Sequence, residues 1–296
     1  MRRRLAYETW YYLHLYAYLA VLLAFAHQLA VGAQFTDNRA ARVAWTGAHL
    51  AVAAFLLAFR VGAPLRLALR HRLRVAAVVR EAPGVVSVYI TGRHLASMHA
   101  QAGQFFRWRF LTRGRWWQAH PFSLSSAPNG RFLRLTVKAS GDHTRGLTRL
   151  RPGVRVLAEG PYGAFTATLR RRRRVLLLAG GVGVAPLRAL LETLPARPGE
   201  VDLVYRASSP EEVLFPHELT GIANARQAAV HWVLGPRAGR HPAGQLAAGR
   251  LRSLVPDLRF REVFVCGPPG MVDVARRELR RAGVPRRRIH AERFDL

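Results

Sequence analysis

The stretch LLLAGGVGVAPLRALL, residues 176–191, decides the fold of the last part of the chain. A wholly apolar run passes directly into three glycines and then into a run with helical spacing. This order predicts a buried strand, a tight turn and a helix, in which glycines let a pyrophosphate approach the backbone and the helix N-terminus supplies N–H donors. An ordinary strand-to-helix turn has the same composition, so the motif alone leaves both interpretations open.

The rest of residues 171–296 repeats this alternation of strand and helix. Helical stretches include 187–194 and 271–282. The apolar runs lie at 175–179, 201–205, 229–234 and 263–266. Strands that alternate with helices are typical of a doubly wound parallel sheet. We therefore expect an α/β domain over residues 171–296.

A second motif, CGPPG at residues 266–270, follows the last of these runs. Ligands of open α/β sheets bind at the carboxyl ends of the strands. Cys266 and Gly267 are therefore expected in the same crevice as the glycine turn. The alternative is that Cys266 is a small buried apolar residue.

Residues 73–170 have the pattern of an antiparallel β-barrel. Glycine and proline turns separate short runs rich in β-forming residues, at 75–79, 85–91, 104–111, 132–138 and 154–159. Short runs with such punctuation predict antiparallel strands that close on themselves.

Three motifs in this barrel favour a flat, phosphorylated ligand. HPFSLSSAP (residues 120–128) offers an aromatic ring flanked by hydroxyl groups, which suits a flat heterocycle. Lys138 ends the next strand, and GDHT (residues 141–144) offers N–H and hydroxyl donors that a phosphate can accept.

The first 72 residues predict a membrane hairpin. No charged residue occurs from Thr9 to Thr36, and the run 11–33 would be roughly 35 Å long as a helix. A second span is expected at about 43–61, with Pro64 ending it. Arginines at residues 2–4 and 66–74 flank the two spans, which places both termini and the later domains in the cytoplasm of a two-pass inner-membrane protein. A cleaved signal peptide is the alternative for the first run.

Charge and composition exclude several classes of protein. The chain has 46 basic and 17 acidic residues, a net charge of +29. Lys138 is the only lysine and the arginines are spread along the chain, so we expect no nucleic-acid partner. The hydrophobic share of 50% excludes disorder. A single cysteine excludes an internal disulfide and a cysteine-held iron–sulfur cluster.

The order of these motifs resembles the ferredoxin–NADP reductase superfamily over residues 73–296. HPFS is similar to the ferric reductase and NADPH oxidase branch, of which this chain would carry only the last two transmembrane helices. The resemblance implies an FAD-binding barrel, an NADP-binding α/β domain, and electron transfer from NADPH through FAD to haem, ferric iron or a protein acceptor.

The resemblance also implies roles for individual residues. Ser123, Cys266 and Glu292 would act at the reacting atoms. FAD would be held by His120, Pro121, Phe122, Ser123, Lys138, Gly141, Thr144 and Phe294. NADP would be held by Gly180, Gly181, Gly183, Pro186, Arg206, Cys266 and Gly267. Asp295 and Leu296 follow the terminal aromatic residue, so we expect its ring to stack loosely on the flavin.

Two histidines in the first apolar run are candidate haem ligands. His14 and His27 would lie about 20 Å apart along a helix, which suits two haems stacked across a bilayer. The branch normally has six helices, so the opposite ligands would come from a helical partner subunit or a second copy. His49 is either a substitute ligand or a satisfied polar residue. A haem-free reductase tethered to the membrane, or the electron-input subunit of a larger complex, is the alternative, with ferredoxin, a ferric chelate or oxygen as acceptor.

Overall fold

The structure is a computed structural model that describes residues 7–32, 38–113, 116–235 and 244–294. The chain divides into two compact units, Met1–Ala63 and Pro64–Leu296. Each unit is described by itself.

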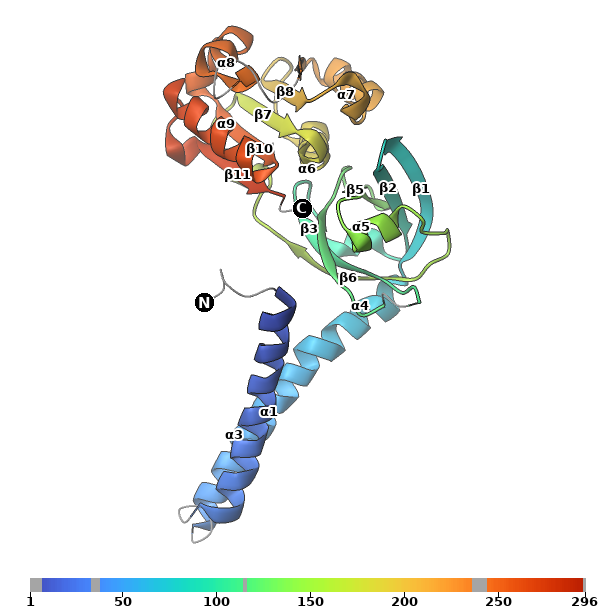
Figure 1. The fold of residues 1–296 in the computed structure, drawn as a ribbon, viewed down its shortest axis with the longest axis vertical. Helices are drawn as coiled ribbons and strands as arrows, with labels where there is room; N and C mark the ends of the chain where they lie inside the picture. Colours follow the sequence, from blue (N-terminus) through green and yellow to red (C-terminus); the bar gives the residue numbers. More distant parts are fainter. Residues whose placement is uncertain (1–6, 33–37, 114–115, 236–243, 295–296) are drawn as a thin grey trace. The chain divides into compact units, whose positions relative to one another are not determined.

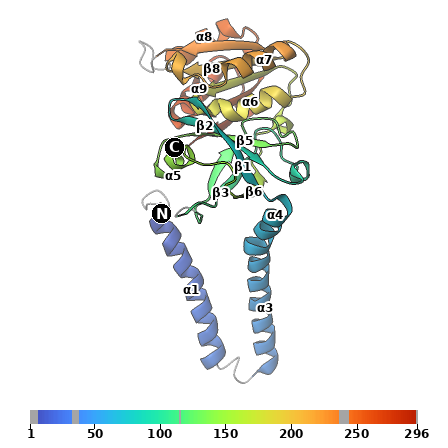
Figure 2. The same cartoon turned by 90° about the vertical axis from the view of Figure 1, so that its right-hand side faces the viewer.

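The first unit is built from two helices, α1 (Tyr7–Val31) and α3 (Arg39–Leu57). The ring of His49 stacks on Phe25 with the centroids 4.2 Å apart. Trp45 Nε1 donates a hydrogen bond to Gln28 Oε1 at 3.1 Å. Both contacts join the end of α1 to the start of α3, and the helices diverge away from them (Figure 2).

The apolar side chains of α3 are exposed. None of the residues of α3 is buried. Leu50, Val52 and Phe55 are each at least 60% exposed. A helix in a water-soluble domain buries its apolar face against a core. The apolar side chains of α3 are instead exposed, and contact between such a surface and water is unfavourable.

The helix that begins at Arg39 continues past Pro64, where the sequence led us to expect its end. A five-residue π-helical segment, Ala58–Gly62, joins α3 to α4 (Ala63–His71). The N–H of Ala63 donates to the carbonyl of Ala58, five residues back. This wider turn lies directly before the proline, which has no N–H to donate and normally clashes with the turn before it. The expected helix end at Pro64 was wrong for this reason.

Length and composition identify one helix that could span a membrane among the residues searched. It is the continuous helix Arg39–His71, of 33 residues, with no residue buried in its most apolar stretch. The part of α1 that could be tested, Tyr16–Val31, is a shorter apolar helix.

The barrel consists of two three-stranded antiparallel sheets (Figure 1). One has the order β1 (Arg74–Ala82), β2 (Val85–Thr91), β5 (Leu133–Lys138). The other has the order β4 (His120–Ser123), β3 (Phe105–Phe110), β6 (Val156–Tyr162). Single bridges join the sheets, from Leu124 to Leu135 and from Arg74 to Arg155. The predicted antiparallel sheet domain is confirmed.

Alternation along the strands fills the barrel. Phe106, Trp108 and Phe110 of β3 are at most 2% exposed and face the core, while the residues between them are only partly buried. A period of two is what a strand with one buried face requires. Helix α5 (Asp142–Leu147) follows β5.

The last domain contains the predicted parallel sheet, and it has five strands, one more than the four apolar runs expected from the sequence. Its order is β11 (Ile289–Arg293), β10 (Glu262–Gly267), β7 (Val175–Gly180), β8 (Val201–Ala207), β9 (Ala229–Leu234). Alternate residues of β7 face opposite sides of the sheet. Leu177 packs in the core that includes residues of α6 (Val184–Thr193) and α7 (Pro216–Arg226). Leu176 packs in the core that includes residues of α8 (Ala248–Leu254) and α9 (Pro269–Arg281).

One of the buried hydrophobic clusters contains residues of both the barrel and the α/β domain. Val85 and Phe165 of the barrel belong to the same buried cluster as Leu187 and Leu190 of α6. Figure 2 shows α6 between the barrel and the parallel sheet. The turn η4 (Gly181–Gly183), which leads into α6, contacts barrel strand β5. The packing therefore brings the predicted phosphate-binding turn against the predicted flavin domain.

Candidate functional site

The carboxyl ends of three neighbouring strands bring the predicted catalytic residues of the α/β domain together. Cys266 on β10 pairs with Ala179 on β7 and with Glu292 on β11. The N–H of Phe294 donates to the carbonyl of Gly267 at 3.1 Å. This bond ties the terminal aromatic residue to the CGPPG motif, at the edge of the sheet where α/β folds bind ligands.

Burial sets the protonation of Cys266 and Glu292. Cys266 is fully buried, and burial, reinforced by the nearby Glu292, raises the pKa of its thiol well above the usual range. Burial also raises the pKa of the Glu292 carboxyl to about 7. Its Oε2 is buried without a hydrogen-bond partner among the described residues. The site therefore presents a neutral thiol and a carboxyl group that can hold a proton near pH 7.

The three glycines of the predicted phosphate turn are required for different structural reasons. Gly181 has a φ of +53°, and a Cβ there would meet nothing within 4 Å, so the backbone is open to a ligand. A Cβ on Gly183 would clash with the backbone of Cys266, and one on Gly180 with the side chain of Met271. These two glycines serve close packing of the turn against β10 and α9.

One neighbour of this turn, Tyr205, was not singled out from the sequence. Tyr205 on β8 is fully buried, donates its hydroxyl proton to the carbonyl of Gly181 at 3.2 Å and accepts the N–H of Leu214 at 3.1 Å. Pro186, which the sequence predicted to help hold NADP, is buried in the first turn of α6. A Tyr at the end of a buried strand has no sequence signal for such a role, because it looks like any core residue.

The end of β8 holds Arg206 in a defined position. Its guanidinium donates to Ser208 Oγ at 3.2 Å and to the carbonyl of Gly235 at 2.6 Å. Arg206 therefore lies at the same carboxyl edge as the glycine turn, where a nucleotide ribose is expected in this type of fold.

The HPFS strand of the barrel is fixed through its neighbour β3. Trp108 Nε1 donates to the carbonyl of Phe122 at 3.0 Å, and Ser123, 6% exposed, pairs with Phe105. Burial first, and then the charge of Arg107, lower the pKa of His120, so this histidine is neutral near pH 7. Pro121 of the same strand is exposed.

The hydroxyl of Ser126, three residues beyond Ser123, is buried without a hydrogen-bond partner among the described residues. A buried unpaired hydroxyl marks a place where a polar ligand atom is expected.

In the Gly-x-x-Thr turn, the hydroxyl of Thr144 forms hydrogen bonds with the backbone of the turn itself. Thr144 Oγ1 accepts the N–H groups of Ser140 and Gly141, each at 2.9 Å, and donates to the carbonyl of Gly141 at 3.0 Å. Thr144 therefore shapes the turn, and its predicted phosphate contact stays a prediction. Lys138 is exposed at the end of β5.

The predicted haem ligands belong to the first unit. His49 Nδ1 lies 3.0 Å from the carbonyl of Trp45, within hydrogen-bond distance, and the ring stacks on Phe25. His27 is exposed, and the side chain of His14 lies outside the described residues. The described part of the chain contains no group of three or more potential metal-ligating residues.

Comparison with known families gives the same two domains. The FAD-binding domain family matches residues 72–166, and the oxidoreductase NAD-binding domain family matches residues 177–277.

Several curated proteins are similar to this chain. It is 33% identical over 193 residues to ferredoxin–NADP reductase B of Sorangium cellulosum, which covers 59% of this chain and 77% of that protein. It is 31% identical over 241 residues to an NADPH oxidoreductase of Mycobacterium tuberculosis, over 79% of this chain. It is 32% identical to the ferredoxin–NAD(+) reductase component of an alkene monooxygenase system of Xanthobacter autotrophicus, over 67% of this chain. The chain spans 62% of the length of each of the latter two relatives.

Solved structures share the fold. The FAD/NAD-binding domain of a nitric oxide dioxygenase of Vibrio cholerae superposes with a TM-score of 0.62 at 25% identity, covering 75% of this chain and 98% of that domain. A ferredoxin–NADP⁺ reductase of Neisseria gonorrhoeae with bound FAD and NADP superposes with a TM-score of 0.60 at 19% identity, covering 76% of this chain and 98% of that chain.

The chain belongs to the ferredoxin–NADP reductase superfamily. Its class is that of the NAD(P)H-dependent FAD oxidoreductases. The residues fit the two cofactors of that class. Ser126 Oγ and Glu292 Oε2 are buried without hydrogen-bond partners among the described residues, so polar atoms of a ligand could pair with them. The open backbone at Gly181 leaves room for a pyrophosphate.

Proposed function

We propose that this chain is a membrane-anchored flavoprotein reductase that takes electrons from NADPH and passes them through FAD to a protein acceptor. The observation that carries the proposal is the meeting of Cys266, Glu292 and Phe294 with the glycine turn at one sheet edge that contacts barrel strand β5. FAD supplies the redox chemistry when bound, because it accepts two electrons together and releases them singly.

The chain's own residues orient the reactants and control protons in this proposal. Ser123 and the protonated carboxyl of Glu292 would donate hydrogen bonds where a flavin and a nicotinamide meet. Cys266, kept neutral by burial, would pack at the reacting carbon. The ring of Phe122 would lie against a bound flavin, and that of Phe294 would cover it until the nicotinamide enters. His120, Lys138 and the turn at Gly141 would hold the rest of FAD.

We also propose that NADPH is preferred to NADH. An arginine at the end of the second strand of such a domain accommodates a 2′-phosphate, whereas an acidic residue there would bind a 2′-hydroxyl. The bonds from Arg206 to Ser208 and Gly235 support this, since they hold the guanidinium at the strand end.

A protein acceptor is favoured by the relatives. Two of them are named as ferredoxin reductase components of monooxygenase systems, one for alkenes and one for 3-ketosteroids. We therefore propose a ferredoxin-type or oxygenase protein as the electron acceptor. A ferric chelate or oxygen would be an alternative acceptor.

A membrane anchor is supported by the long apolar helix Arg39–His71 and by the exposed apolar side chains of α3. With arginines flanking both apolar runs, the FAD and NADP domains would face the cytoplasm at the inner membrane. The test is alkaline carbonate extraction of membranes from cells that express the full chain. Recovery of the protein in the soluble fraction would refute the anchor.

Haem in the membrane is a second candidate acceptor, with His14 and His27 as its candidate ligands. Bis-histidine haem needs one imidazole on each face of the iron, and one helix supplies a single face at each depth. Haem would therefore require a helical partner or a second copy. Optical spectra of the detergent-purified monomer should show flavin bands and no Soret band, and two low-spin haems in a verified monomer would overturn this expectation.

The reductase activity itself is tested by anaerobic mixing of the FAD-loaded protein with NADPH. We expect bleaching of the flavin band within one turnover and reduction of added ferredoxin-type acceptors. A purified protein that binds no FAD, or whose FAD is not reduced by NADPH, would contradict the proposal.

A further inference from the structure

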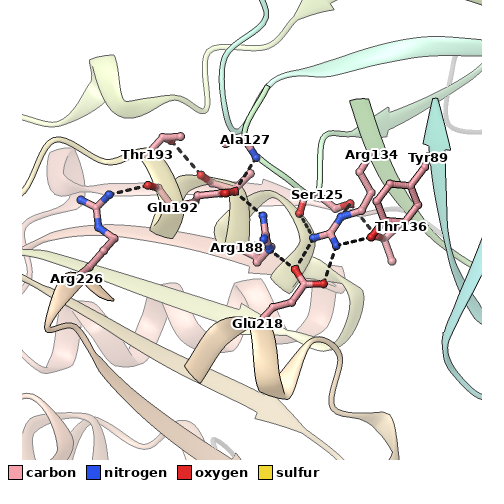
Figure 3. Close-up of polar contacts among 11 residues, drawn as sticks. Tyr89, Ser125, Ala127, Arg134, Thr136, Arg188, Glu192, Thr193, Glu218 and Arg226 are labelled. Carbon is pink, nitrogen blue, oxygen red and sulfur yellow. Dashed lines mark hydrogen bonds and ion pairs between the residues drawn. The ribbon is translucent and has the colours of Figure 1, made fainter. Parts of the chain in front are cut away.

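A network of four charged side chains joins the barrel to the α/β domain. We call Arg134, Arg188, Glu192 and Glu218 the interdomain network (Figure 3). Arg134 lies on barrel strand β5, whereas the other three lie on α6 and α7 of the α/β domain.

The first crossing is a bidentate ion pair. Arg134 Nη1 donates to Glu218 Oε1 at 2.8 Å, and Arg134 Nη2 donates to Glu218 Oε2 at 3.0 Å. The same guanidinium donates to the carbonyl of Ser125 at 2.7 Å and to the hydroxyl of Tyr89 at 3.1 Å. Planar two-point pairing fixes direction as well as distance.

Arg134 is deeply buried, with only 2% of its surface exposed. Its guanidinium lies over the ring of Phe215, 4.7 Å from the centroid. Burial alone would raise the pKa of Glu218, but the hydrogen bonds and charge of Arg134 and Arg188 outweigh it and hold that pKa below its usual range. The pair is therefore ionised, and a buried cation that loses its partner is strongly disfavoured.

The second crossing starts from the same carboxylate. Glu218 Oε2 lies 2.8 Å from Arg188 Nε, and Arg188 Nη1 donates to Glu192 Oε2 at 2.5 Å. Glu192 Oε2 in turn accepts the backbone N–H of Ala127 at 2.9 Å. The network thus leaves the barrel at Arg134 and returns to it at Ala127 (Figure 3).

The anchored barrel segment is the one that follows the HPFS strand. Ser125 and Ala127 come two and four residues after Ser123, and both are held by the network. At its other end the network holds α6, the helix that begins directly after the glycine turn. It therefore links the segment beside the proposed flavin site to the helix beside the proposed nucleotide site.

We propose that Glu218 is a positioning residue for hydride transfer, which sets the nicotinamide against the flavin through Arg134 and Arg188. The inference rests on the proposed function. Hydride transfer needs the reacting atoms about 3–3.5 Å apart, and a misplacement of about 1 Å costs about a hundredfold in rate. The shared hydrophobic core holds the two domains together but is not directional. The bidentate pair of Arg134 with Glu218 and the hydrogen bond from the N–H of Ala127 to Glu192 are directional.

The test compares Glu218→Gln with a matched control in the full-length, FAD-loaded protein. The control is Asp257→Asn, because Asp257 also pairs with two arginines, Arg174 and Arg261, at 2.6 Å each, but all three lie in the α/β domain. We would measure FAD content, the dissociation constant for NADP⁺, the long-wavelength charge-transfer absorbance of stacked nicotinamide and flavin, and the single-turnover rate of flavin reduction.

In Glu218→Gln we expect FAD content and NADP⁺ affinity within about twofold of the parent. We expect the charge-transfer band to weaken and the reduction rate to fall between about tenfold and a hundredfold, with an altered isotope effect from NADPH deuterated at the transferred position. The control should keep the parent band and rate. Parental band and rate in Glu218→Gln would overturn the inference, provided that NADPH reduces the parent; failure of the parent itself would instead refute the proposed function.

A second variant separates positioning from stability. Replacing Arg134 and Glu218 together by Met removes the buried charges, and such apolar replacements often restore stability. If the network positions the domains, the double variant should melt close to the parent but reduce its flavin as slowly as Glu218→Gln. A reduction rate that recovers along with the melting temperature would show a purely structural role and would also overturn the inference.

Discussion

The buried carboxyl of Glu292 makes the stability of the protein depend on pH in a calculable way. Its folded-state pKa is about 7 against an ordinary value of 4.5. Because the folded pKa is raised for an acid, the folded state holds this proton more tightly than the unfolded chain does. The contribution of this carboxyl to stability is therefore complete below about pH 4.5 and is lost as pH rises from there through the folded pKa.

The size of the effect follows from the shift. The difference of 7 minus 4.5 is about 2.5 units, or about 3.4 kcal/mol at about 1.36 kcal/mol per unit. A single titrating group with these values has lost about 1.4 kcal/mol at pH 5.5 and nearly all of it at pH 8.5. The side chain in Glu292→Gln cannot ionise. The free energy of unfolding of this variant, relative to that of the parent, should therefore be about 2 kcal/mol higher at pH 8.5 than at pH 5.5.

The assay is thermal unfolding of parent and variant in the same detergent at pH 5.5 and pH 8.5. A change of about 2 kcal/mol in the stability difference between variant and parent corresponds to a change of roughly 4–8 °C in the difference between their melting temperatures, for domains of this size. The gap between the two melting temperatures should be larger at the higher pH. An equal gap at both pH values, or one that narrows as pH rises, would refute the assignment of a buried, unpaired carboxyl at this position.

Three further predictions concern the nucleotide and flavin sites. Arg206→Ala should raise the dissociation constant of NADPH about tenfold or more, since it removes a charge-assisted contact of about 1.5–3 kcal/mol, with little effect on NADH; titration of both nucleotides checks this, and equal losses would contradict the 2′-phosphate role. Ser123→Ala should retain FAD but slow its reduction by NADPH in stopped flow, because one hydroxyl and little packing are removed; a parental rate would show that the hydroxyl has no part in the reaction. Gly183→Ala should lower the free energy of unfolding by about 1–3 kcal/mol in denaturant titrations, because the added Cβ clashes with the backbone of Cys266, and an unchanged midpoint would mean that the turn can move away.

The sequence predicted the parts of the site that depend on local chemistry. The glycine turn after a buried run, the parallel sheet and the CGPPG motif at a strand end all follow from short patterns. The pairing of Cys266 with Glu292 needed the strand register, because the two residues are far apart in the chain and only the adjacency of β10 and β11 brings them together.

Other features depend on contacts that no short pattern encodes. Arg134 occupies a strand position in a chain rich in arginine, and its partner Glu218 lies 84 residues away, so nothing local distinguishes it from an exposed arginine. Pro64 was expected to end a helix, and the π-helical turn before it that lets the helix continue has no composition of its own. The hydroxyl of Thr144 looked free to meet a ligand, but the turn's own backbone engages it.

The single lysine gives this chain an unusually simple reactivity toward amine-directed reagents. Lys138 is exposed at the end of β5, and apart from the terminal amino group it is the one primary amine in the sequence. An acylating reagent would therefore label one side chain, and a bound flavin that contacts Lys138 would protect it. Acylation followed by mass spectrometry, with and without FAD, could thus footprint the cofactor on the unaltered protein.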